Sequence, residues 1–108
     1  MLSKMKQYLS PEQTAKLIEL GFEKPKSIVG HDGYWGYDYA YSIGELLSFL
    51  PKEIDYNGLK NTLYIFVNQD GWDVEYSDFL GELYSTYRSE FIDAIFDMSV
   101  KLKTEGVI

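Results

Sequence analysis

Hydrophobic residues recur at helical spacing in three segments of the chain, and the first segment has the clearest end signals. Ser10 stands as an N-cap before a proline, and Gln13 at the third helical position completes a capping box. The apolar positions that follow keep to one side of a helix, and Gly21 stands where a glycine commonly ends one. The pattern predicts a helix over residues 11–20.

Two further helices are predicted by the same criteria. Ser42 and Glu45 form a second capping box at the start of residues 43–50. The last helix is expected to have Ser89 as its N-cap and to end at Gly106. Its apolar stripe consists of Phe91, Ile92, Ile95, Met98 and Leu102.

Apolar and aromatic residues recur at every second position beside the Asp32-Gly33 pair, and this pattern predicts a β-hairpin around that pair. With these two residues as the loop, Ile28 would face Tyr37. One face would then carry an aromatic ladder, which is more typical of a core face than of a stacking platform for bases or sugars. The residues on this face are Ile28, Trp35, Tyr37, Tyr39 and Tyr41.

A second hairpin is predicted from residues 61–67 and 72–76, which flank Asn68-Gln69-Asp70-Gly71. A loop of two or of four residues gives the same two faces. The core face holds Leu63, Ile65, Val67, Trp72, Val74 and Tyr76. The opposite face holds Tyr64, Phe66, Asp73 and Glu75.

The two aromatic residues on that opposite face require an explanation. A solvated strand face should carry polar residues at positions 64 and 66, as it does at 73 and 75. We therefore expect Tyr64 and Phe66 to be covered by residues 79–87, by another part of the sheet layer, or by a second molecule. Residues 79–87 are ambiguous, because their apolar residues have helical spacing but Gly81 weakens a helix.

These elements together predict an α+β fold in a single domain, residues 1–108. We expect a two-layer sandwich of about four antiparallel strands in two hairpins, with three or four helices. The predicted order is αββαββα.

Composition restricts the chemistry. The chain of 108 residues has no cysteine, which excludes disulfides and thiolate nucleophiles. No stretch approaches the ~20 apolar residues that span a bilayer. The N-terminus lacks the apolar segment of a signal peptide, so we expect a cytoplasmic protein that begins near Met1.

The net charge of −7 is unevenly distributed. Arg88 is the only basic residue between positions 70 and 97, and this field disfavours direct binding of nucleic acid. Eight carboxylates fall in that stretch: Asp70, Asp73, Glu75, Asp78, Glu82, Glu90, Asp93 and Asp97.

Candidate catalytic chemistry is sparse. His31 is the only histidine, and no nucleophile motif accompanies it. A turn explains residues 68–73 better than a calcium loop, which would place Phe66 at the first ligand position. No cofactor and no metal are expected. An alternative is a small enzyme or ligand-binding domain with a cleft near Gly30–Tyr41, lined by His31, Trp35 and Tyr37.

Four segments together resemble a group of short, uncharacterised bacterial proteins that are frequent in gut anaerobes and in their phages and mobile elements. The segments are LSPEQTAKLIELGF, YSIGELLSFLPKEI, NTLYIFVNQDGWDVEY and FIDAIFDMSVKLKTEGVI. They cover most of the chain, and no activity is established for the group. The resemblance implies a cytoplasmic accessory protein of mobile-element origin.

These observations favour a non-enzymatic module that acts through protein–protein contact or self-association. The expected partner-binding residues are Tyr64, Phe66, Asp73 and Glu75. Aromatic side chains would supply affinity and the acids would steer a basic partner. We expect no membrane among its partners. A sharper form is an acidic decoy that occupies a nucleic-acid-binding protein.

Overall fold

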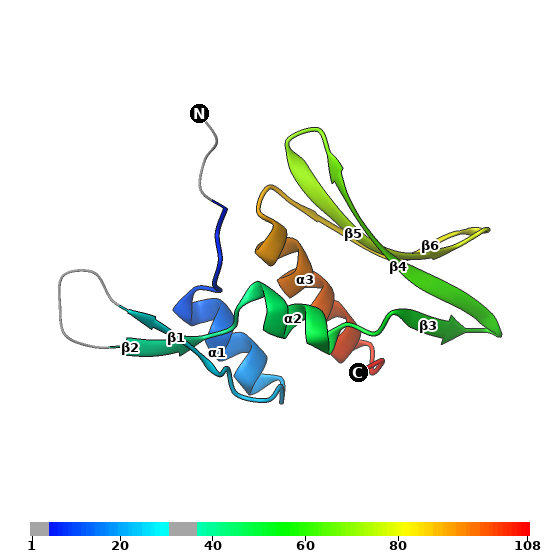
Figure 1. Ribbon diagram of the computed structural model, residues 1–108. Coiled ribbons are helices and arrows are strands. Elements are labelled where there is room, and N and C mark those ends of the chain that lie inside the picture. Colours follow the sequence, from blue (N-terminus) through cyan, green and yellow to red (C-terminus); the bar gives the residue numbers. More distant parts are fainter. Residues whose placement is uncertain (1–4, 31–36) are drawn as a thin grey trace.

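The computed structural model describes residues 5–30 and 37–108 (Figure 1). Within them the chain forms three helices and six strands, which confirms the α+β class and the expected order with two strands added. The helices are α1 (Pro11–Glu19), α2 (Ile43–Phe49) and α3 (Phe91–Thr104). The strands are β1 (Ser27–Gly30), β2 (Tyr37–Ala40), β3 (Glu53–Tyr56), β4 (Leu59–Asn68), β5 (Gly71–Asp78) and β6 (Gly81–Arg88).

The ends of α1 and α2 form as the sequence predicts. In both capping boxes the serine hydroxyl accepts the N3 backbone N–H, and the N3 side chain accepts the N-cap N–H. Gly21 has a φ of 98° and donates its N–H to Ile18 O, while Phe22 donates to Leu17 O. Both bonds satisfy carbonyls left free at the end of α1.

The strands form two antiparallel sheets. β1 pairs with β2, and the other four strands make a sheet in the order β3-β4-β5-β6. The turn between β4 and β5 has two residues, because Asn68 pairs with Gly71. The register places Ile65 opposite Val74 and Phe66 opposite Asp73, so the two predicted faces of this hairpin are confirmed.

Helix α3 packs on one face of the four-stranded sheet, and α2 packs on α3 (Figure 1). Val74 and Tyr76 of β5 are fully buried in a core shared with Ile92 and Ile95 of α3. Tyr76 also donates its hydroxyl to Pro51 O at 2.6 Å. The core fades along β4, because Ile65 is 36% exposed and Val67 is 62% exposed. The predicted core face is therefore covered along β5 and becomes exposed along β4 toward the turn.

Two predictions of local structure require correction, and one segment that the sequence leaves open is assigned by the structure. Residues 81–88, where helical spacing left the structure open, form β6, with a register irregularity at Tyr76/Ser77 in its partner β5. The N-cap of α3 is Glu90 rather than Ser89, and its side chain makes no capping hydrogen bond. Ile28 pairs with Tyr39 rather than with Tyr37, and the turn expected at Asp32-Gly33 lies outside the described residues.

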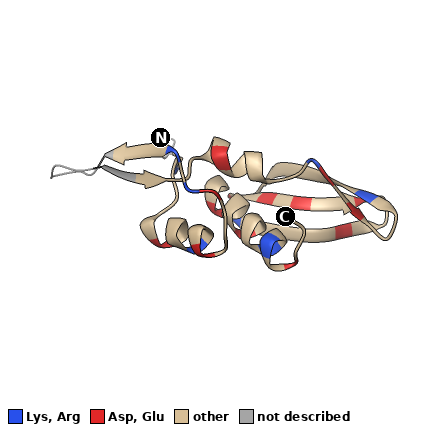
Figure 2. Ribbon diagram, turned by 90° about the horizontal axis from the view of Figure 1, so that it is seen from below, with Lys and Arg blue, Asp and Glu red and all other residues tan. Residues whose placement is uncertain are grey.

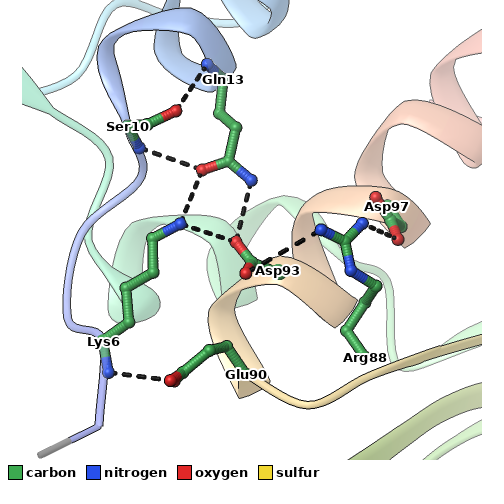
Figure 3. A network of polar contacts seen from close by, with 7 residues as sticks. All are labelled: Lys6, Ser10, Gln13, Arg88, Glu90, Asp93 and Asp97. Carbon is green, nitrogen blue, oxygen red and sulfur yellow. Dashed lines mark hydrogen bonds and ion pairs between the residues drawn. The ribbon is translucent and has the colours of Figure 1, made fainter.

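A polar network fastens the N-terminal segment to α1 and α3 (Figure 3). Lys6 Nζ lies 2.9 Å from Asp93 Oδ1 and 3.0 Å from Gln13 Oε1, and Gln13 Nε2 donates to the same carboxylate oxygen at 2.8 Å. Arg88 Nη1 pairs with Asp97 at 2.9 Å on the far side. Burial of the Asp93 carboxyl opposes its ionisation, but the hydrogen bonds from Gln13 and Lys6 and the nearby cations outweigh this and lower its pKa.

Candidate functional site

The face of the four-stranded sheet opposite α3 gathers the partner-binding residues that the sequence predicts. Tyr64 lies directly opposite Glu75, and Phe66 lies directly opposite Asp73, on the β4–β5 pair. Residues paired across two strands point to the same side of a sheet, so all four side chains share this face. We call it the open face.

The two aromatic side chains are only about half covered by the described part of the chain. Tyr64 is 52% exposed and Phe66 is 43% exposed. Of the internal covers expected from the sequence, the segment 79–87 supplies none, because β6 joins the sheet beside β5 and extends the layer. An exposed apolar cluster flanked by polar residues is typical of a binding surface.

The open face is strongly acidic. Register places Glu53 and Asp55 of β3 on the same face as Asp73 and Glu75 of β5. Lys60 is the basic residue of this face. Figure 2 shows the same imbalance, with mostly acidic positions along the strands of the large sheet. The Asp73 carboxylate is oriented by Asn68, whose Nδ2 donates to it at 3.0 Å.

A third aromatic residue, Tyr87, belongs to this face and was missed from the sequence. It pairs with Asp73 across β5 and β6, and it is 45% exposed. Its hydroxyl donates to Asp70 Oδ1 at 3.0 Å, and this bond raises the pKa of the phenol. Its ring lies over Gly71, where an added Cβ would stand 2.5 Å from the ring. If residues 81–88 had been assigned as a strand, the alternation of its side chains from Ser85 to Tyr87 would have placed Tyr87 on the open face.

The second candidate site is a cavity between α1 and the β1–β2 hairpin. The cavity measures about 450 Å³, within the range of small-molecule sites. It is lined by Leu9, Pro11, Thr14, Ala15, Ile18, Val29, Tyr39 and Ala40. Thr14 is 6% exposed, and its Oγ1 has no hydrogen-bond partner among the described residues. This cavity adjoins the cleft expected near Gly30–Tyr41.

The residues predicted to line that cleft fall outside the part of the chain whose side chains the structure describes. His31 and Trp35 lie outside the described residues, and so does the side chain of Tyr37, whose backbone begins β2. Of the rest of the predicted aromatic ladder, Tyr41 is buried in the core but Tyr39 is 59% exposed. The two differ because Tyr41 follows β2 into the core, while Tyr39 stands on the projecting hairpin.

No family model matches the chain, and comparisons with curated proteins and with solved structures give no significant match either. Within residues 5–30 and 37–108, no helix is long and apolar enough to cross a membrane. The same ranges hold no cluster of His, Cys, Asp and Glu side chains suited to a metal ion. The open face and the cavity beside α1 are therefore the two candidate sites.

Proposed function

We propose that this chain is a non-enzymatic cytoplasmic accessory protein whose open face binds a basic surface of a partner protein. The observation that carries the proposal is the exposure of Tyr64 and Phe66 beside Asp73 and Glu75, on a sheet face over which no described helix packs. Exposed aromatic residues are costly to leave in water, and they are enriched among the residues that dominate binding energy.

The acids determine the kind of partner. Asp73 and Glu75 lie opposite Phe66 and Tyr64, and Glu53 and Asp55 of β3 extend the negative charge of the same face, where Lys60 opposes it. Such a field accelerates encounter with a basic surface and repels an acidic one. A nucleic-acid-binding protein has a surface of this kind, and occupying it would make the chain a decoy.

Capture from a bacterial lysate with the wild type and three double variants tests this function. Tyr64→Ser combined with Phe66→Ser removes the aromatic residues, and Asp73→Asn combined with Glu75→Gln removes the charges. The matched control, Phe79→Ser with Leu80→Ser, removes two apolar side chains that are 86% and 72% exposed at the β5–β6 turn. We expect a basic protein to bind the wild type and the control, and to be lost with both open-face variants.

The proposal fails if capture is the same for the aromatic variant and for the turn control. Sedimentation of the purified chain separates the remaining possibility, which is self-association through the same face. If the wild type forms an oligomer and the Tyr64→Ser, Phe66→Ser variant does not, the open face binds a second copy of the chain rather than a basic partner.

The cavity beside α1 supports a second candidate function, the binding of a small neutral molecule. Its lining is apolar, and the unpartnered Thr14 hydroxyl would pair with one polar group of the ligand. p-Cresol and toluene differ by one hydroxyl, and Thr14→Val removes the hydroxyl of the protein with little change in shape.

For that candidate we expect p-cresol, more than toluene, to perturb the amide resonances of Ala15 and Ala40. Thr14→Val should abolish the preference. The same substitution should raise the melting temperature of the free protein, because it removes a buried unsatisfied group. If neither compound perturbs these resonances at millimolar concentration, the cavity has no such function.

A further inference from the structure

The edge of the large sheet is unpaired along the last part of β4. β3 pairs with β4 only from Leu59 to Thr62, and Leu63 then donates its N–H to Lys52 O at 3.0 Å. Over residues 64–68, no described residue forms a backbone pair with β4 on this side. In Figure 1 the β4–β5 hairpin extends beyond the end of β3.

The direction of the backbone groups follows from that one hydrogen bond. In an antiparallel strand, the N–H and C=O of one residue point to the same edge, and those of the next residue point to the other edge. The N–H and C=O of Ile65 and Val67 therefore point to the same edge as those of Leu63. Tyr64 and Phe66 direct theirs toward β5. Ile65 and Val67 therefore offer unpaired donors and acceptors, which form a template for another strand.

This edge lacks the features that usually protect one. Residues 64–67 are four consecutive apolar residues with no charge, proline or bulge among them. All four are exposed: Tyr64 by 52%, Ile65 by 36%, Phe66 by 43% and Val67 by 62%. An added strand would thus find apolar neighbours on both faces.

The charges of the open face select the occupant. An added strand would lie ~4.8 Å from β4, with alternate side chains beside the rings of Tyr64 and Phe66. Arginine at these positions would stack on the rings and reach over β4 toward Asp73 and Glu75. A second copy of the chain would instead bring its own acidic face to the same edge, and the net charge of −7 opposes this.

We propose that residues 64–68 of β4 bind an extended segment of a partner by strand addition, and that this segment alternates basic and apolar residues. The inference rests on the proposed function, since the basic residues of the segment would lie on the open face. It adds that main-chain hydrogen bonds to Ile65 and Val67 hold the partner.

Amide hydrogen exchange tests the main-chain contact directly. In the free protein the N–H groups of Tyr64 and Phe66 should exchange slowly and those of Ile65 and Val67 quickly. A short peptide of alternating Arg and Val should slow exchange at Ile65 and Val67, and a peptide of alternating Glu and Val should not. A peptide methylated on the amides that face β4 should bind about tenfold more weakly or worse.

A matched pair of variants at Val67 provides the second readout. Val67→Pro removes an N–H that β5 does not use, and a proline with its ring toward an open edge is compatible with an edge strand. Val67→Ala keeps the N–H. We expect Val67→Pro to weaken the Arg-Val peptide about tenfold and Val67→Ala to change its affinity by less than ~3-fold.

The outcomes separate this inference from the proposed function. If the Arg-Val peptide binds and requires Tyr64 and Phe66 but leaves exchange at Ile65 and Val67 unchanged, the open face binds a partner without strand addition, and the inference is wrong. If the peptide does not bind while a lysate partner still requires the open face, the inference is again wrong and the function stands. Protection of Ile65 and Val67 that rises with protein concentration alone would assign the edge to a second copy and overturn the basic occupant.

Discussion

The two faces of the four-stranded sheet are built by the same strands and have opposite surroundings. On the α3 side, Val74 and Tyr76 are fully buried. On the open side, Tyr64 and Phe66 keep about half of their surface in contact with solvent, at 52% and 43%. Apolar content does not distinguish the faces, because both carry aromatic residues. What distinguishes them is a covering element that one face has and the other lacks.

On the face that α3 covers, the burial of side chains also decreases toward the β4–β5 turn. α3 begins at Phe91, whose ring packs against Trp72 with 4.8 Å between centroids. Beyond Trp72 the hairpin continues to its turn without a helix, and Val67, the partner of Trp72, is 62% exposed. An apolar pattern on a strand therefore indicates a surface that needs cover, and it does not say whether the cover comes from the same chain.

The largest effect is expected from exchanging the two faces. Inserting one residue after Gln69, without a compensating bulge, shifts the register of β5 against β4, so that Val74 and Tyr76 turn outward and Asp73 and Glu75 turn toward α3. Burying two carboxylates and exposing two core side chains should cost more than ~4 kcal/mol of unfolding free energy. Urea denaturation measures this. An insertion variant with wild-type stability would show that the register is not fixed by the core.

A smaller effect should follow from single truncations on adjacent positions of β5. Val74→Ala leaves a cavity under α3 and should cost ~2–3 kcal/mol. Glu75→Ala, one residue along and on the open face, should change stability by less than ~0.5 kcal/mol. Equal losses in the two variants, measured by thermal or urea denaturation, would contradict the assignment of the faces.

Much of this fold could be predicted, because its signals are local. The capping boxes at Ser10 and Ser42 and the stop at Gly21 depend on neighbours a few residues away, and all three form. The faces of the β4–β5 hairpin follow from parity alone. The β3–β4 hairpin had a signal that was overlooked: Asn57 and Gly58 have φ of 53° and 80°, as a two-residue hairpin turn requires.

The rest could not be predicted because it depends on distant parts of the chain. Leu83 and Tyr84 share helical spacing with their neighbours, yet residues 81–88 form a strand because β5 offers an edge and α3 a face to cover. The candidate site divides in the same way. Alternation grouped Tyr64 and Phe66 with Asp73 and Glu75, but only the three-dimensional arrangement reveals that the described residues leave this face half exposed.

A third prediction compares aromatic residues across the sheet. Replacing Tyr64 and Phe66 together by Ser should cost ~1–2 kcal/mol, since each ring is already half exposed and loses only its buried part. The same change at the buried pair Val74 and Tyr76 should leave little folded protein. Circular dichroism melts of the two double variants give the comparison. A Tyr64, Phe66 variant that is unfolded at room temperature would end the interface hypothesis.

The smallest effect concerns two acids, one held in the polar network and one on the open face. Asp93→Asn removes the charge paired with Lys6 and should cost ~1 kcal/mol at neutral pH, whereas Asp73→Asn should cost less than ~0.5 kcal/mol. Because the folded state lowers the pKa of Asp93 below its ordinary value of 3.8, ionised Asp93 stabilises the fold above that value. The contribution should fade as the pH falls through the lowered pKa, where the carboxyl is protonated in both states. Urea denaturation from pH 7 to pH 3 should therefore show a difference between wild type and Asp93→Asn that is full at neutral pH and shrinks in acid. A difference that stays constant over this range would mean that the substitution acts through packing and not through the charge of Asp93.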